Sequence, residues 1–225
     1  MIGKKVFRFA EIKKMDIVLE PTMDMINEDK VPYKGKWGEM FFGNDNPITL
    51  ELGCGKGEYA VGLARKYPNR NFIAVDIKGN RMYIGATQAE EEGLKNIKFL
   101  RTKIDFIDSF FAENEVDEIW LTFSDPQPKK PRKRLTSELF IARYRKFLKP
   151  GGFIHLKTDS DILFESTEEQ IKLHNYKPLF LTWDLYKDID QFPEEEQEIL
   201  SIKTYYEELF TSKGSVIKYT KFTIN

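Results

Sequence analysis

Short apolar runs alternate with stretches of helical periodicity from Ile48 to the end of the chain. Runs rich in β-branched and aromatic residues predict buried strands, and strands that alternate with helices predict a mostly parallel sheet. Helical connections cover both faces of such a sheet. We therefore expect an α/β fold with a mostly parallel, seven-stranded sheet. The strands are predicted at 48–52, 71–77, 97–100, 116–123 and 153–158, near 180–186, and at 215–219.

Helices are expected between these strands, and prolines or glycines end them. Pro68 ends the first helix, because proline cannot continue the helical hydrogen bonding. Pro150 and Gly151 end a later one, where glycine supplies a positive φ. The segment 194–196 is predicted as an acidic loop. The helices are predicted at about 58–66, 80–92, 104–113, 137–147 and 204–212, with another from residue 160.

Residues 1–47 do not follow this alternation. They mix charged residues with Pro21, Pro32 and a glycine-containing stretch around Trp37. Proline and glycine at such spacings favour loops. We therefore predict an irregular N-terminal extension over residues 1–47 that packs on the domain or on a ligand, followed by one domain over residues 48–225.

The charges of the chain nearly cancel: 35 Lys and Arg oppose 36 Asp and Glu, which leaves a net charge of −1. This balance excludes a uniformly polycationic nucleic-acid binder. The single cysteine, Cys54, excludes a disulfide framework and a multi-cysteine metal site, and it indicates a reducing compartment. No apolar run approaches the roughly 20 residues of a membrane span, so we expect a cytoplasmic protein with no metal and no membrane partner.

A glycine-rich turn follows the first predicted strand. Gly53, Gly55 and Gly57 allow the backbone to turn tightly and its N–H groups to approach a ligand at the carboxyl ends of the strands. Glu58 stands where a dinucleotide fingerprint has its last glycine. Its charge would oppose a pyrophosphate, so NAD is disfavoured.

Two carboxylates flank this turn and favour a different nucleoside cofactor. Asp76 ends the second predicted strand, where a carboxylate commonly accepts hydrogen bonds from ribose hydroxyls. Glu51 precedes the turn and complements an ammonium or sulfonium group. This pattern indicates S-adenosylmethionine. The alternative is that the glycines only form a tight turn and that Asp76 caps the next helix; Cys54 is interpreted as a small filler and not as a nucleophile.

The segment after the fourth predicted strand is the most informative in the chain. Asp125 ends that strand, and Pro126 and Pro128 stiffen the loop around it, so we expect its carboxylate to face the cofactor cleft. A cluster of basic residues follows. In a neutral chain such a cluster indicates phosphate binding, although a basic run alone is more often a solvated loop. The cluster comprises Lys129, Lys130, Arg132, Lys133 and Arg134.

Taken together, these segments resemble the bacterial tRNA (guanine-N7)-methyltransferase family. The resemblance covers about residues 48–219. In that family the fourth-strand motif commonly reads Phe-Pro-Asp-Pro-Trp-Pro-Lys-Lys before a basic stretch with histidine, whereas this chain has Ser124, Gln127 and a basic run without histidine. The resemblance implies a Rossmann-like S-adenosylmethionine-dependent methyltransferase fold. It is carried by the glycine turn, by 124–130, by Thr158 and Asp159, and by 204–207.

The resemblance also implies roles for individual residues. Asp125 is expected to serve both the cofactor pocket and catalysis. Lys103 stands where the family usually has Asp or Asn near the adenine. The expected cofactor residues are Glu51, Gly53, Gly55, Gly57, Asp76, Lys103 and Asp125; the nucleotide contacts are Lys129, Asp159, Thr204, Tyr205, Tyr206 and Glu207; the tRNA backbone contacts are Arg132, Lys133 and Arg134.

Structural roles are open for several of these residues. Asp159 is also placed to cap the following helix, and Thr204 with Glu207 has the spacing of a capping box. His155 and Trp120 lie within apolar strands and are predicted as core residues.

The implied reaction is methylation of guanine N7 in the tRNA variable loop by a monomer or a homodimer. N7 has an available lone pair, so the reaction needs alignment more than a strong base. One rival is a methyltransferase acting on an exocyclic amine, although the chain lacks that motif's adjacent prolines and following aromatic residue. The other rival is a non-catalytic RNA-binding subunit on the same scaffold.

Overall fold

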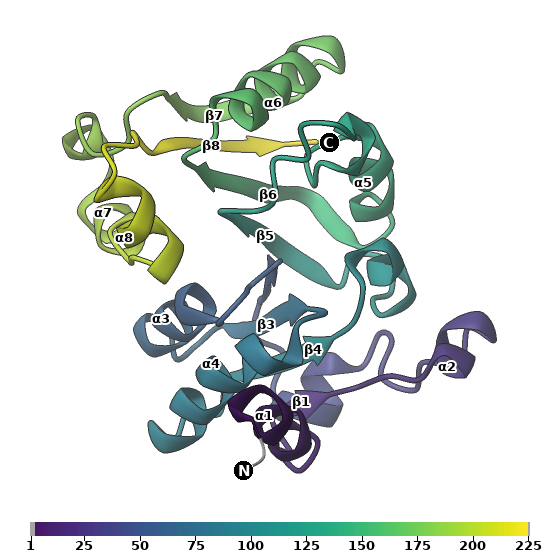
Figure 1. The fold of residues 1–225 in the computed structure, drawn as a ribbon. Helices are drawn as coiled ribbons and strands as arrows, with labels where there is room; N and C mark the ends of the chain where they lie inside the picture. Colours follow the sequence, from purple (N-terminus) through teal and green to yellow (C-terminus); the bar gives the residue numbers. More distant parts are fainter. Residues whose placement is uncertain (1–2, 225) are drawn as a thin grey trace.

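The sheet contains every strand that the sequence predicts and one more (Figure 1). The structure is a computed structural model and describes residues 3–224. The strand order in the sheet is β1-β4-β3-β2-β5-β6-β8-β7. β8 is antiparallel to both of its neighbours, and all other neighbouring strands are parallel. The strands are β1 (Val18–Leu19), β2 (Ile48–Leu52), β3 (Asn71–Asp76), β4 (Ile97–Arg101), β5 (Val116–Thr122), β6 (Leu148–Thr158), β7 (Lys177–Thr182) and β8 (Lys218–Thr223).

The additional strand comes from the N-terminal segment. The sheet therefore has eight strands and not the predicted seven, and the segment is not irregular as predicted. Val18 and Leu19 of β1 pair in parallel with β4. The same segment forms α1 (Lys4–Ile12), α2 (Met23–Asn27) and the π-helix η1 (Gly38–Phe42). Trp37 is fully buried and its indole N–H donates to the carbonyl oxygen of Phe110 at 2.9 Å, so the segment packs on the domain.

Helices cover both faces of the sheet because its strands alternate between two apolar cores. In β3, Ile73 and Val75 face one core, and Phe72 and Ala74 face the other. The first core includes side chains of α5 (Glu138–Tyr144) and α6 (Asp161–Leu173). The second includes α1, α3 (Glu58–Lys66), α4 (Gly79–Glu91) and α7 (Glu194–Leu200).

Some predicted boundaries were wrong. The segment predicted as an acidic loop is α7, because Pro193 precedes it and Glu194–Glu196 in the first turn complement the positive end of a helix. The helix expected over 104–113 is the 3₁₀ helix η2 (Ile104–Ser109). The last two strands are shifted from their predicted positions. β7 is an edge strand whose apolar side chains are mostly exposed, so burial does not mark its ends in the sequence. The remaining elements are η3 (Pro131–Lys133), η4 (Ile189–Gln191) and α8 (Tyr205–Thr211).

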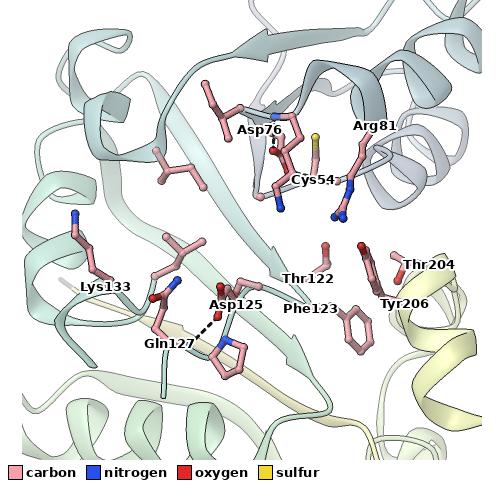
Figure 2. Close-up of a pocket in the computed structure, with 18 of the residues that line it drawn as sticks. Cys54, Asp76, Arg81, Thr122, Phe123, Asp125, Gln127, Lys133, Thr204 and Tyr206 are labelled. Atoms are coloured by element: carbon pink, nitrogen blue, oxygen red, sulfur yellow. Dashed lines mark hydrogen bonds between the residues drawn. The ribbon is translucent and has the colours of Figure 1, made fainter. Parts of the chain in front are cut away.

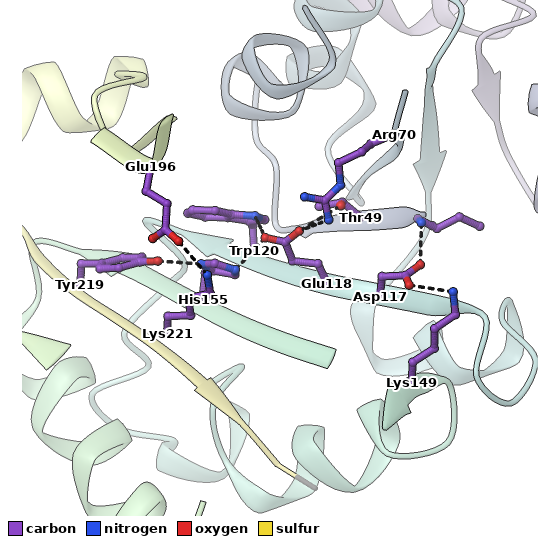
Figure 3. A network of polar contacts seen from close by, with 11 residues as sticks. Thr49, Arg70, Asp117, Glu118, Trp120, Lys149, His155, Glu196, Tyr219 and Lys221 are labelled. Carbon is purple, nitrogen blue, oxygen red and sulfur yellow. Dashed lines mark hydrogen bonds and ion pairs between the residues drawn. The ribbon is translucent and has the colours of Figure 1, made fainter. Parts of the chain in front are cut away.

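A buried polar cluster crosses β5, β6 and β8 (Figure 3). His155 Nε2 lies 2.7 Å from a Glu118 oxygen, and its Nδ1 lies 2.8 Å from the Tyr219 hydroxyl. The Trp120 ring stacks on the His155 ring, with 3.9 Å between the ring centroids. Burial opposes ionisation of Glu118, yet His155 and Arg70 lower its pKa to about 2. His155 and Trp120 are therefore core residues, as predicted.

The connectivity fixes where a ligand binds. β2 lies between β3 and β5, so the strand order reverses on either side of it, and ligands of open α/β sheets bind in the crevice at this switch point. No helix among residues 3–224 is long and apolar enough to cross a membrane.

Candidate active site

A cavity of about 670 Å³ opens at the carboxyl ends of β2, β3, β5 and β6 (Figure 2). It brings together residues from distant parts of the sequence, from Gly53 in the glycine turn to Phe210 in α8. The predicted site residues among its lining are Gly53, Gly55, Asp76, Lys103, Asp125, Lys133, Asp159, Thr204 and Tyr206.

The glycine turn is held close to the neighbouring strand. The backbone N–H groups of Gly53 and Cys54 donate to the Val75 carbonyl oxygen at 2.8 and 3.0 Å. All three glycines of the turn have positive φ, and a Cβ at Gly57 would lie 2.7 Å from the Phe99 ring. Only glycine fits this position, so the turn approaches the sheet closely and leaves room for a ligand above it.

Asp76 orders the turn from the end of β3. Its two oxygens accept hydrogen bonds from the backbone N–H groups of Gly55 at 2.9 Å and Lys78 at 2.8 Å. Lys78, and not Asp76, is the N-cap residue of α4, and no side chain of the described residues caps this helix, so the alternative that Asp76 caps it was wrong. Each carboxylate oxygen has a second acceptor site, and the side chain lines the cavity. Asp76 therefore joins the turn to α4 and remains able to bind ribose hydroxyls.

Glu51 lies beneath the turn and not among the residues that line the cavity. It is 2 % exposed, and its carboxylate accepts hydrogen bonds from Ala60 N at 2.9 Å and from the Thr122 hydroxyl. Burial raises its pKa to about 7. Glu51 is therefore not placed to contact the cofactor, contrary to the prediction. Its hydrogen bonds connect β2 to α3 and β5.

The loop after β5 presents Asp125 to the cavity. Its Oδ1 accepts a hydrogen bond from Gln127 N at 2.9 Å, which Figure 2 shows, and the side chain is exposed. Phe123 and Gln127 have positive φ values of 50° and 46°, which are unfavourable for residues with a side chain. These two residues lie on either side of Asp125, whose side chain lines the cavity.

The basic cluster does not act as one surface. Lys130 and Lys133 line the cavity, and Lys133 forms an ion pair with Asp105. Lys129 and Arg132 are exposed beside it. Arg134 is 7 % exposed and its Nε donates to the Pro126 carbonyl oxygen at 3.0 Å. Arg134 therefore supports the loop from inside, which corrects the expectation that it contacts the tRNA backbone.

The opposite wall comes from Asp159 and Ser160, which lie between β6 and α6, and from α8. Asp159 lines the cavity and burial raises its pKa; Ser160, and not Asp159, caps α6 by accepting from Leu163 N at 3.3 Å. Thr204 caps α8 by accepting from Glu207 N at 3.2 Å.

The neighbours of Thr204 point in different directions. Tyr206 lines the cavity, whereas Tyr205 lies outside its lining, under the Lys56 ammonium at 3.7 Å. Glu207 is 0 % exposed. The expected contact between Glu207 and the substrate is therefore a wrong prediction for this conformation, because its carboxylate has no access to the cavity.

Sequence reasoning missed Arg81. This side chain lies on the first turn of α4, lines the cavity, and points toward Tyr206 across the opening (Figure 2). Its guanidinium carbon lies 5.5 Å from the centroid of the Tyr206 ring. Within residues 3–224, Arg81 has no carboxylate close enough for an ion pair. Its position in the first turn of the helix that follows Asp76 was the only available signal in the sequence.

Comparison with known proteins shows the family of the chain. A family model described as "Putative methyltransferase" matches residues 45–220. The chain is 53 % identical to the tRNA (guanine-N(7)-)-methyltransferase of Bacteroides thetaiotaomicron, over 99 % of this chain and 87 % of that protein. It is 45 % identical to the protein of the same name from Christiangramia forsetii, over 98 % and 97 % of the two chains. The chain belongs to the tRNA (guanine-N(7)-)-methyltransferase family.

Solved structures that share the fold are more distant in sequence. The 16S rRNA methyltransferase KamB aligns with a TM-score of 0.60 at 15 % identity, over 83 % of this chain and 92 % of that one. A SAM-dependent methyltransferase from Aquifex aeolicus aligns with a TM-score of 0.55 at 13 % identity, over 96 % and 98 %. These likenesses confirm the Rossmann-like methyltransferase fold.

The cavity fits the cofactor of the tRNA (guanine-N(7)-)-methyltransferase family, S-adenosylmethionine. It offers the Asp76 carboxylate, backbone groups of the glycine turn, and the Ser124 hydroxyl, a buried group that lacks a hydrogen-bond partner within the described chain. Across residues 3–224 no three His, Cys, Asp or Glu side chains are grouped to hold a metal ion. Burial raises the pKa of the Cys54 thiol, which favours a filling role over a nucleophilic one.

Proposed function

We propose that this protein transfers the methyl group of S-adenosylmethionine to N7 of a guanine in the variable loop of tRNA. The observation that carries the proposal is the position of Asp125, which is exposed between two halves of one cavity. One half comprises the glycine turn and Asp76, and the other comprises Asp159, Thr204 and Tyr206. The high identity to tRNA (guanine-N(7)-)-methyltransferases supports the choice of substrate.

The cofactor half is assigned by the chemistry of its donors. Asp76 accepts hydrogen bonds from ribose hydroxyls, and the glycine turn brings backbone groups against the amino-acid portion. When bound, the cofactor supplies a methyl group activated by a sulfonium charge. Lys103 lines the same half and is assigned to the adenine side of the pocket.

Asp125 acts at the junction of the two halves. Its Oδ1 is held by Gln127 N at 2.9 Å, so the orientation of the carboxylate is fixed before substrate binds. Guanine N7 attacks with its own lone pair and needs no general base, so alignment is the main contribution to rate. Methylation leaves a positive charge on the purine, and a preorganised carboxylate stabilises that charge as it develops.

The remaining residues hold the nucleotide and the tRNA. Tyr206 offers an aromatic face to the base, and Asp159 and Thr204 offer oxygens to its polar edge. Lys129, Lys130 and Arg132 are exposed beside the cavity and suit tRNA phosphates. Because N7 is inaccessible in the deep major groove of A-form RNA, the target lies in a loop or a tertiary junction. We propose that the protein acts in the cytoplasm, where its tRNA substrate is found.

The experiment is nucleoside analysis by mass spectrometry after the protein is incubated with S-adenosylmethionine and unmodified tRNA. We expect 7-methylguanosine at one position of the variable loop. Formation of an N2-methylated guanosine or an N6-methylated adenosine would replace the proposal with an exocyclic-amine activity. A protein that binds tRNA but neither binds S-adenosylmethionine nor forms a methylated nucleoside would be the non-catalytic subunit.

A further inference from the structure

A buried lysine joins the substrate half of the cavity to the sheet. Lys157 lies on β6, two residues before Asp159, and its side chain is 0 % exposed. Its ammonium donates hydrogen bonds to the carbonyl oxygens of Leu200 at 2.6 Å and Ile202 at 3.1 Å, and to a Glu207 oxygen at 2.8 Å. An ammonium has three protons, so each one has an acceptor.

Glu207 is equally enclosed. One oxygen accepts from Lys157 and the other accepts from the Tyr186 hydroxyl. Its backbone N–H is bound by Thr204, and its carbonyl oxygen accepts from the Thr211 hydroxyl at 2.8 Å. Because Glu207 is 0 % exposed and lies outside the cavity lining, it presents no acceptor to a base in the cavity.

The segment that Lys157 holds is the one that delivers the nucleotide-binding side chains. Leu200 is the last residue of α7, whose final carbonyl groups carry negative partial charge and lack partners within the helix. The ammonium binds this helix end and the first turn of α8 at once. The linker between α7 and α8 carries Thr204 and leads to Tyr206. The Lys157 side chain therefore fixes the positions of Thr204 and Tyr206 relative to Asp159.

The charge of this pair is costly to bury. Burial lowers the pKa of Lys157 to about 8, although Glu207 acts in the opposite direction. Apolar side chains of similar volume would fill the space with comparable stability. What they would lack is three directed hydrogen bonds from one atom to three points of the 200–207 segment.

We infer that Lys157 is a positioning residue: it holds the segment that carries Thr204 and Tyr206 in the substrate half of the cavity. Glu207 acts through α8 instead of touching the base. This inference rests on the proposed function. Lys157 touches neither the cavity nor the cofactor half, which is built on β2 and β3. Its loss should therefore reduce the rate of transfer and leave cofactor binding intact.

The test compares methyl transfer to tRNA with S-adenosylmethionine affinity by calorimetry in three variants. Lys157→Met removes the anchor and leaves Glu207 buried without its counter-charge, so it can fail to fold. Lys157→Met/Glu207→Met removes both charges at similar volume and should fold. Glu207→Gln keeps one oxygen to accept from Lys157 and replaces the other by an NH2 that can donate to the Tyr186 hydroxyl, without the carboxylate charge.

For the double variant we expect cofactor affinity within about threefold of wild type and kcat at saturating tRNA lowered roughly tenfold to a hundredfold, with KM for tRNA little changed. If the variant were merely destabilised, a smaller fraction of the protein would bind cofactor, and kcat calculated per cofactor-binding site would stay at the wild-type value. Glu207→Gln should keep kcat within about fivefold of wild type.

Two results would overturn the inference. One is wild-type kcat in the double variant, which would show that the directed hydrogen bonds are not needed. The other is a loss in Glu207→Gln as large as that of an Asp125 variant, which would mean that Glu207 touches the substrate. Absence of methyl transfer by the wild-type protein would be a failure of the proposed function and is thereby distinguished from both.

Discussion

The Glu51 carboxylate accepts a hydrogen bond from the Thr122 hydroxyl directly beneath the glycine turn, which joins β2 to β5. Burial raises the pKa of Glu51 from 4.5 to about 7, so the folded protein binds this proton more tightly than the unfolded chain does. The resulting stabilisation is complete below pH 4.5 and is lost as the pH rises through 7.

Relative to Glu51→Gln, the wild-type protein should therefore lose up to about 3 kcal/mol of unfolding free energy across that pH interval. Urea denaturation of both proteins at a series of pH values measures the difference. Parallel pH profiles for the two proteins would contradict the assigned burial.

Gly85 allows α4 to approach the glycine turn. A Cβ there would overlap the carbonyl oxygen of Lys56. Gly85→Ala should force the helix away from the turn and weaken S-adenosylmethionine binding by about 1–3 kcal/mol, the usual cost of overpacking. Calorimetric titration with the cofactor checks this result. Glu91→Ala, an exposed change on the same helix, is the matched control and should bind normally; equal affinities for both variants would refute the close contact.

Much of this arrangement could be predicted from the sequence because it depends on local patterns. The strands show as apolar runs, and parallel strands bring their carboxyl ends to one edge, so Asp76 and Asp125 were expected to lie together. β1 was missed because two residues are too few for a detectable alternation.

The remaining errors concern contacts between distant segments. Glu207 is a polar residue with a capping-box spacing, and nothing near it in the sequence indicates that Lys157, 50 positions away, encloses it. Arg134 belongs to a basic run, yet only the folded loop shows that Pro126 covers it. Arg81 lies near Tyr206 only because the fold brings α4 and α8 to opposite sides of one cavity. Burial of a charged side chain is decided by its tertiary partners.

Asp125→Asn tests the role of charge at the junction of the cavity. Asparagine keeps an oxygen for the hydrogen bond from Gln127 N and removes the negative charge. We expect kcat to fall roughly a hundredfold, while KM for tRNA changes little, because the charge acts mainly on the developing purine cation. Asp125→Ala should abolish turnover. Steady-state kinetics with tRNA decide the matter, and an Asp125→Asn enzyme of normal kcat would exclude electrostatic stabilisation.

Lys129, Lys130 and Arg132 should set the salt dependence of tRNA binding. They are exposed, and none has a carboxylate within ion-pair distance in residues 3–224. Each neutralised contact should reduce the slope of log K against log salt by roughly 0.7–0.9. Binding isotherms at several salt concentrations measure the slope. Arg134→Gln is the control: because Arg134 is buried, this change should lower thermal stability and leave the slope unaltered.

The proposed reaction is defined by the atom that receives the methyl group. Transcripts of one tRNA made with guanine or with 7-deazaguanine differ at the atom that is proposed to accept the methyl group. Transfer of a labelled methyl group from S-adenosylmethionine should occur with the guanine transcript and be absent with the 7-deazaguanine transcript, while both compete equally for binding. Comparable labelling of the 7-deazaguanine transcript would contradict methylation at N7.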